Sequence, residues 1–171
     1  GSDKAEILKG TALALSEDVV ITAYHVVSQA FDVEGLTIKG KKVKLEGILG
    51  LDKAHDLALL KLKGKLQALP IGSIDGLAAG ARLFALGSNE SGQIVIAEGT
   101  FRNTVDLGAA GKVLDVSIPA PDQFRGGPLV DVNGQLVGML IVGERNLRFG
   151  LPIGSLVSVP RAGKVSEFKT Q

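Results

Sequence analysis

The sequence predicts an all-β protein, and three observations carry this prediction. Apolar and polar residues alternate with period two in about ten short segments, as in strands with one buried face. Glycine accounts for 23 of the 171 residues, as expected where many turns need positive φ. Asn133-Gly134, two residues that tolerate left-handed turn geometry, separates two apolar runs and predicts a β-hairpin over residues 126–142. Many short strands of this kind favour a barrel or a sandwich.

Strand signals occur in both halves of the chain. The clearest alternating segments are residues 11–15, 42–45, 60–63, 93–96 and 112–116. Residues 51–63 are also compatible with an amphipathic helix, but the Leu-Lys alternation at their end and the following Gly64 favour a strand.

The expected boundaries follow from the punctuation between these segments. A stretch with Pro70 and several glycines predicts a linker over residues 66–79, between an N-terminal barrel (3–65) and a C-terminal barrel (80–154). Residues 1–2 are interpreted as a tag remnant, and the tail 155–171 is expected to form one helical turn and then fray.

Composition excludes several classes of protein. A net charge of +1 with 45% hydrophobic residues argues against a disordered chain and against a nucleic-acid binder. The absence of cysteine rules out a disulfide scaffold, a thiolate zinc site and a cysteine nucleophile. The longest apolar run, Leu136 to Val142, is too short to cross a bilayer, so we expect no membrane contact by this domain. Composition leaves the compartment and the oligomeric state undetermined.

Three segments carry the residues of a known catalytic centre. They are Thr22-Ala-Tyr-His-Val-Val27, residues 52–60 around His55-Asp56, and residues 122–130 with Gly126-Gly-Pro-Leu-Val130. In this order they resemble the triad segments of trypsin-like serine proteases, most closely the bacterial HtrA/DegP type. Residues 149–153 resemble the final strand of that family. The resemblance implies the two-barrel trypsin-like fold, with six-stranded barrels and a cleft between them, and it favours an extracytoplasmic location.

The same resemblance assigns the triad positions. His25 matches the general base and Asp56 matches the acid that orients it. The nucleophile position is Arg125, where the family has serine. Arginine cannot attack a carbonyl, because its guanidinium stays protonated and offers no lone pair.

The loop before this position also departs from the family. Gln123 replaces the glycine that supplies an oxyanion-hole N–H, and Phe124 replaces a polar residue. Losing three groups together indicates a pseudoprotease, so we expect no enzymatic activity. An active endopeptidase that uses another hydroxyl, such as Ser88 or Ser91, is a remote alternative, since turn chemistry explains both residues.

Without catalysis, the fold can still bind. The first hypothesis is a scaffold, or an interaction module for a protein or an extended peptide, with a groove along Leu140, Ile141, Val142 and Gly143. His25 and Asp56 are then a structural relic, or His25 joins Arg125 in a polar cleft for an anionic or peptide ligand. Alternatively, Arg125 pairs with Asp56 and closes the cleft.

The second hypothesis is transition-metal binding. Magnetosome-associated pseudoproteases of this family bind metals, and His55, His25 and Asp56 are possible ligands here, as is a surface pair of His55 with Asp52. A closed zinc site wants four protein ligands, and the chain offers two histidines and no cysteine. We therefore expect no cofactor, with a divalent transition metal as the alternative.

Overall fold

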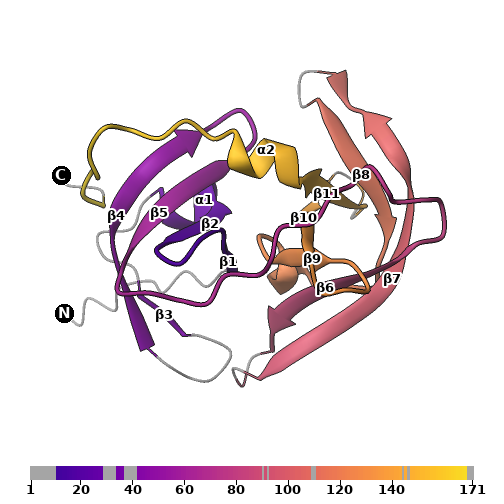
Figure 1. The fold of residues 1–171 in the computed structure, drawn as a ribbon, viewed down its shortest axis with the longest axis horizontal. Coiled ribbons are helices and arrows are strands. Elements are labelled where there is room, and N and C mark those ends of the chain that lie inside the picture. The colour runs from indigo at the N-terminus through magenta and orange to yellow at the C-terminus, as the bar shows by residue number, and fades with distance from the viewer. Residues whose placement is uncertain are drawn as a thin grey trace.

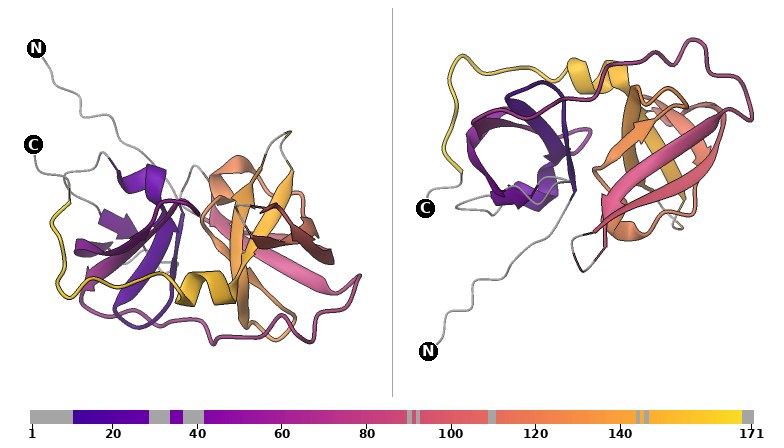
Figure 2. Two further views of the ribbon diagram at one scale, coloured as in Figure 1. Left: turned by 90° about the horizontal axis from the view of Figure 1, so that it is seen from above. Right: turned by 60° about the horizontal axis from the view of Figure 1, so that its bottom comes forward.

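Two β-sheets, one from each half of the chain, make up the protein (Figure 1). The computed structural model describes residues 11–28, 34–36, 42–89, 91, 93–108, 111–143, 145 and 147–168. In the first half, a five-stranded antiparallel sheet has the order β1-β2-β5-β4-β3 and curls around its own core (Figure 2). Its strands are β1 (Ala12–Ala14), β2 (Val19–Ala23), β3 (Glu34–Leu36), β4 (Lys42–Asp52) and β5 (Leu57–Lys63).

The second half is a closed six-stranded barrel of order β10-β11-β8-β7-β6-β9. Its strands are β6 (Arg82–Ser88), β7 (Ile94–Asp106), β8 (Lys112–Ser117), β9 (Pro128–Val130), β10 (Leu136–Val142) and β11 (Arg148–Pro152). The helical elements given for the described residues are short: α1 (Tyr24–Val27), the 3₁₀ turn η2 (Asp122–Phe124) and α2 (Ile153–Val157). The all-β, trypsin-like architecture of two barrels predicted from the sequence is confirmed, with one difference. Among the described residues the first half is a curled five-stranded sheet, and only the second half is a closed six-stranded barrel.

The ambiguous segment 51–63 is a turn followed by a strand. β4 ends at Asp52, residues 53–56 form a turn, and β5 begins at Leu57. β5 pairs with β2 on one side and with β4 on the other, so most of its residues are buried and helix formation is outcompeted. The strand interpretation is right for its second part.

The predicted hairpin pairs β9 with β10, and its turn is built around Asp131. The Asp131 carboxylate accepts the backbone N–H groups of Asn133 and Gln135 at 2.9 and 3.0 Å. Only Gly134 has positive φ, at 72°, so the turn is longer than the two-residue type that Asn-Gly signals. The side chain of Asp131 therefore replaces part of the expected turn chemistry.

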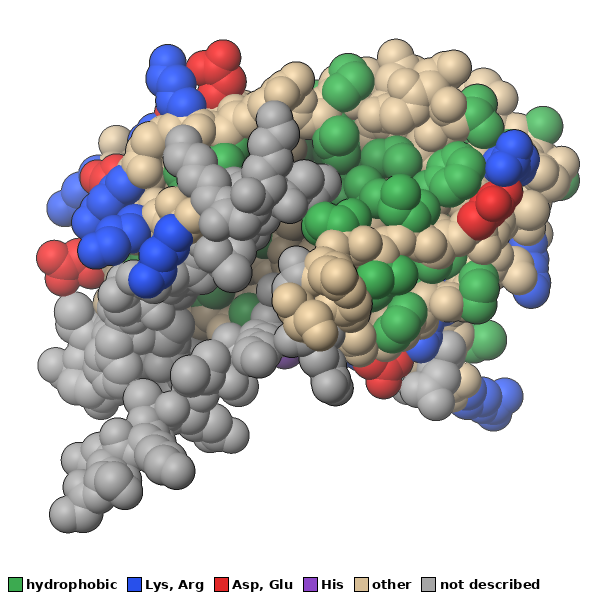
Figure 3. All heavy atoms as spheres, turned by 90° about the horizontal axis from the view of Figure 1, so that it is seen from below, with side chains coloured by type: hydrophobic (Ala, Val, Ile, Leu, Met, Phe, Trp, Pro, Cys, Tyr) green, Lys and Arg blue, Asp and Glu red, His purple; other side chains and the backbone are tan. Residues whose placement is uncertain are grey.

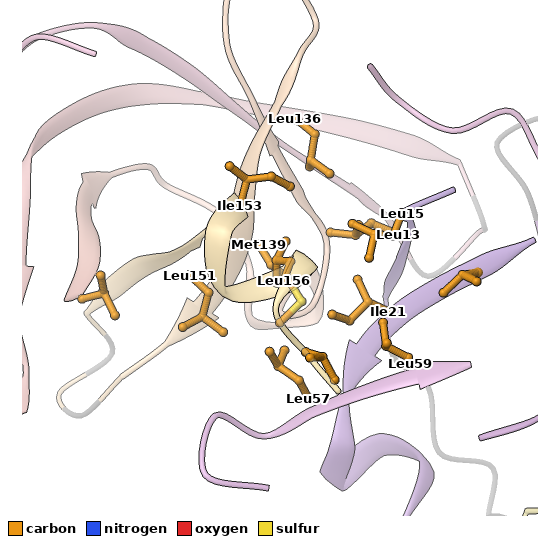
Figure 4. Packing of buried hydrophobic residues seen from close by; sticks show 13 residues of the cluster. Leu13, Leu15, Ile21, Leu57, Leu59, Leu136, Met139, Leu151, Ile153 and Leu156 are labelled. Atoms are coloured by element: carbon orange, nitrogen blue, oxygen red, sulfur yellow. The ribbon is translucent and has the colours of Figure 1, made fainter. Parts of the chain in front are cut away.

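A shared apolar core joins the two halves (Figure 4). Leu13, Ile21 and Leu59 come from the first sheet, and Met139 and Leu151 come from the barrel. Leu156 of α2 is fully buried among them, so this helix seals the junction. The cluster fixes how β2, which leads to His25, faces the barrel.

The described part of the C-terminal tail, up to Phe168, corrects one expectation, because it does not fray after α2. Beyond Pro160 it runs back along the first sheet, where Ser166 and Ile48 exchange two backbone hydrogen bonds (Figure 2). Gly47 allows this approach, since a Cβ there would collide with the carbonyl oxygen of Ser166. Phe168 is only 5% exposed and packs in the core of the first sheet. The tail therefore acts as a strap over β4.

Apolar side chains also remain on the outside of the barrel. Ile94 and Ile96 on β7 are 39% and 60% exposed, and Ile96 pairs with Leu86 of β6 on the outer face. From below, hydrophobic side chains gather over the barrel half of the molecule (Figure 3). None of the helices in the described segments has the length and apolar composition that a membrane span requires.

Candidate functional site

His25 and Asp56 form a hydrogen-bonded pair at the end of β2. The His25 Nδ1–H donates to Asp56 Oδ2 at 2.5 Å, and the backbone N–H of His25 donates to Oδ1 at 2.9 Å. The two side chains are 49% and 46% exposed. A carboxylate held against Nδ1 fixes the tautomer of the ring and leaves Nε2 as an acceptor, which is the arrangement that a general base requires.

The backbone around Asp56 strengthens this pair. Its carbonyl accepts the N–H of Tyr24 at 2.8 Å, so the first two backbone N–H groups of α1 both donate to Asp56. The residue has φ of 56°, a left-handed conformation that aspartate tolerates better than most side chains. The short turn that follows β4 thus places the carboxylate under His25.

The 3₁₀ turn η2, together with Arg125 at its C-terminal end, forms the Asp122–Arg125 turn. The backbone N–H of Arg125 donates to the carbonyl of Asp122 at 3.1 Å, and that of Phe124 donates to Pro121 at 3.0 Å. Gln123 lies inside this turn and is not among the described non-glycine residues with positive φ. The N–H of Arg125 is therefore used within the turn.

A partly buried arginine from β11 holds this turn from outside. Arg148 donates from Nε to the carbonyl of Ala120 at 3.1 Å and from Nη2 to Asp122 Oδ1 at 2.8 Å. Its side chain is 16% exposed, against 74% for Asp122. Asp122 thus accepts Arg148 with its carboxylate and Arg125 with its carbonyl.

Two threonines link the turn to β2, the strand that leads to His25. Thr11 donates from Oγ1 to the carbonyl of Gln123 at 2.7 Å, and Thr22 donates from Oγ1 to the carbonyl of Thr11 at 2.9 Å. Thr22 belongs to β2, which leads directly into α1 and His25. The Arg125 and His25 segments therefore meet across the junction of the two halves.

Phe124 anchors the turn in the barrel core. Its ring is 1% exposed and packs against β6 at Gly87, where an added Cβ would overlap the ring. An aromatic ring in this place is compatible only with a residue as small as glycine on β6. The exchange of a polar residue for Phe124 thus has a matching partner in the structure.

The side chain of Arg125 reaches the edge of β10. Its Nη2 donates to the carbonyl of Val142 at 3.4 Å, a long bond. The alternative in which Arg125 pairs with Asp56 is wrong, because the Asp56 carboxylate is engaged by His25 and no described carboxylate lies within ion-pair distance of Arg125. The half-buried guanidinium therefore has no counter-charge among the described residues.

The four predicted groove residues differ in the direction of their backbone N–H and carbonyl groups. Leu140 exchanges backbone bonds with Gly126 and Gly127, and the Gly143 N–H donates to Leu147 of the β10–β11 connection. The backbone groups of Ile141 point toward β11, as those of Gly143 do, because alternate residues in a strand present their backbone groups to the same side. Only Val142 turns its N–H and carbonyl to the open edge of β10.

His55 forms a separate pair with Asp52. Its Nδ1–H donates to Asp52 Oδ2 at 2.7 Å, and its backbone N–H donates to Oδ1 at 3.1 Å. His55 and Asp56 are adjacent in a turn, yet each is bound to a different partner. Across the described part of the chain, no three His, Asp or Glu side chains gather closely enough to hold a metal ion. The ligand set His55, His25 and Asp56 is therefore not assembled.

Two residues of the site carry no recognisable signal in the sequence. Asp122 accepts the N–H of Arg125 with its backbone carbonyl, which any residue could do. Arg148, which donates to the Asp122 carboxylate, lies 26 positions farther along the chain, on β11. Only the strand order of the closed barrel, which places β11 beside β8 and β10, explains why Arg148 meets the turn.

Comparisons with known proteins agree with this geometry. A profile of the trypsin-like peptidase domain matches residues 10–139. The anti-sigma-I factor RsgI9 of Acetivibrio thermocellus is 27% identical over 150 residues, which cover 85% of this chain and 21% of that protein. The probable periplasmic serine endoprotease DegP-like of Chlamydia trachomatis is 30% identical over 140 residues, or 78% of this chain and 28% of the relative.

A solved structure is similar over nearly the whole chain. The apo protease domain of MamO from Magnetospirillum magneticum superposes with a TM-score of 0.68 at 25% identity, covering 92% of this chain and 90% of that one. This chain spans less than a third of the length of either curated relative. The match over residues 10–139, with HtrA/DegP-like relatives and structural neighbours of the same fold, shows that the chain belongs to the family of trypsin-like peptidase domains.

Proposed function

We propose that this domain has lost peptide-bond hydrolysis and works as an interaction module that binds an extended protein segment along the edge of β10. The observation that carries the proposal is the hydrogen bond from the Arg125 N–H to the carbonyl of Asp122. Acyl transfer in this family needs that amide to face the developing oxyanion, as well as a hydroxyl on the same residue. Arg125 supplies neither.

The remaining half of the triad has a structural use. His25 and Asp56 join α1 to the turn before β5 through three hydrogen bonds, counting the Tyr24 N–H. A pair with this role persists after catalysis is lost, because removing either member leaves polar groups unpaired.

Binding needs only an open strand edge. An extended segment can pair with the N–H and carbonyl of Val142, and this addition of a strand requires no nucleophile. The relative from Chlamydia trachomatis is named a serine endoprotease, an enzyme class that acts on polypeptides. This relationship supports a polypeptide as the ligand.

A fluorophosphonate probe, which labels activated serine hydroxyls, tests the loss of catalysis. We expect no labelling of the native chain. Arg125→Ser should label no faster than the same variant carrying His25→Ala, because the amide at position 125 stays bonded within the turn.

Two results would contradict this expectation. His25-dependent labelling of Arg125→Ser alone would show that the turn does not block the site. Casein turnover by the native chain that disappears with His25→Ala would overturn the proposal itself. Circular dichroism of each variant checks that its fold is retained.

A further inference from the structure

Arg125 combines charge, burial and position in a way that catalytic loss alone does not explain. Two other arginines of the barrel have carboxylate partners: Arg82 pairs with Glu98, and Arg148 pairs with Asp122. Arg125 is half-buried and makes one long bond to an uncharged carbonyl, Val142 O. A guanidinium has five donors in a planar fork that matches a carboxylate, so most of its binding capacity is unused.

The edge of β10 fixes where a bound peptide must stop. Toward the start of β10, Leu140 is already paired with Gly126 and Gly127. Val142 is the next residue whose backbone faces that edge, so a peptide can pair there but no farther inward. Arg125 precedes Gly126 and lies at this limit, with its guanidinium across Val142.

The direction of the peptide follows from the pairing. Every recorded strand pair of the barrel is antiparallel. A peptide antiparallel to β10 runs from Val142 toward Leu140 as it goes from its N-terminus to its C-terminus. Its C-terminal end therefore arrives at Arg125. The opposite direction would bring a free N-terminal ammonium to the guanidinium, which repels it.

We propose that the β10 edge binds the free C-terminus of an extended polypeptide, and that Arg125 recognises its terminal carboxylate. The inference rests on the proposed function, since it names the ligand of the same groove. Binding exchanges the long bond to Val142 O for a charge-assisted pair with the carboxylate, and it frees that carbonyl to accept a peptide N–H. In this proposal, the position that holds the nucleophile in the family holds a residue that recognises a carboxylate.

The test compares two forms of one probe. The probe is a fluorescein-labelled, eight-residue apolar peptide, made with a free C-terminal carboxylate or with a C-terminal amide, and binding is followed by fluorescence anisotropy at fixed ionic strength. We expect the carboxylate form to bind about tenfold more tightly, as one charge-assisted hydrogen-bonded pair provides.

Variants of Arg125 assign the effect. Arg125→Met should remove the difference between the two peptides, and Arg125→Lys should keep part of it. Arg145→Met is the matched control, because Arg145 is an exposed arginine of the β10–β11 connection, and it should leave the preference unchanged.

The outcomes distinguish the role of Arg125 from peptide binding by the β10 groove. Equal binding of both peptides, or a preference that survives Arg125→Met or vanishes with Arg145→Met, would overturn the assignment of Arg125 while the groove itself stands. Failure of both peptides to bind at millimolar concentration would overturn the proposed function as well.

Discussion

Arg148 donates to Asp122 Oδ1 at 2.8 Å and so ties β11 to the Asp122–Arg125 turn. The same guanidinium bonds the carbonyl of Ala120, a residue that is 4% exposed. Because Asp122 also accepts the N–H of Arg125, one arginine stabilises the turn conformation that withholds this amide. The turn is thus supported from the barrel as well as by its own sequence.

Arg148→Met should lower the free energy of unfolding by about 1–2 kcal/mol, since it leaves a buried carbonyl without this donor. Urea unfolding measures the change. Arg102→Met removes an exposed arginine of β7 and should stay within about 0.5 kcal/mol of the native chain. Equal effects of the two substitutions would mean that the Arg148 contacts do not stabilise the fold.

Gly87→Ala should destabilise the domain by about 1–3 kcal/mol, because the new methyl group would overlap the buried ring of Phe124. Adding Phe124→Leu should recover part of the loss, since it shortens the side chain at that contact. Gly154→Ala is the matched control, because a Cβ at that position in α2 meets no neighbour. If thermal unfolding shows Gly87→Ala to be as stable as Gly154→Ala, the packing of Phe124 described above is wrong.

Replacements of Asp56 should rank by what they keep. Asp56→Asn keeps an acceptor for the His25 N–H and tolerates the φ of 56°, so its cost should be the smaller. Asp56→Ala loses both side-chain bonds and strains the backbone, which should cost about 2–3 kcal/mol. Urea unfolding of the two variants checks this order. The reverse order would show that the pair does not support the turn.

Acid stability should depend on Asp18. Its hydrogen bond with Lys61 lowers the pKa of the carboxyl from its ordinary value of 3.8. A lowered pKa in the folded state contributes stability above the unfolded value, and this contribution is lost as pH falls through the folded value. Asp18→Asn should therefore lower the Tm at pH 7 and flatten its fall below about pH 4.

Lys61→Met provides the control for this prediction. Without Lys61, the carboxyl loses the partner that lowers its pKa, so adding Asp18→Asn should change the acid profile little. An unchanged fall of Tm with pH in the Asp18→Asn single variant would contradict the assignment.

The strands were largely predictable because period-two alternation reports burial on one face. Residues 11–15 contain β1, and residues 112–116 lie within β8, as expected. The course of the tail was not predictable, because its contacts with Ile48 and Leu49 are backbone bonds that leave no side-chain pattern. Beyond α2, the described part of the tail buries two apolar side chains, Val159 and Phe168.

Part of the candidate site was likewise predictable from the sequence, and part was not. The positions of His25 and Asp56 follow from motifs that resemble the family, and the structure brings the two side chains together. The bond between Arg125 and Val142 needs the strand order of the barrel, and the Asp122 carbonyl acts through main chain alone. Neither has a local sequence signal. The roles given to Arg125 and to the β10 groove stay predictions.

An NMR titration tests whether the edge of β10 binds a polypeptide without cleaving it. ¹⁵N-labelled domain is mixed with an unstructured peptide, and the spectra report both the amide shifts of the protein and the integrity of the peptide over a day. We predict shifts at Val142 and Gly143 and an intact peptide. A flat response at millimolar peptide, or cleavage that His25→Ala abolishes, would contradict the account.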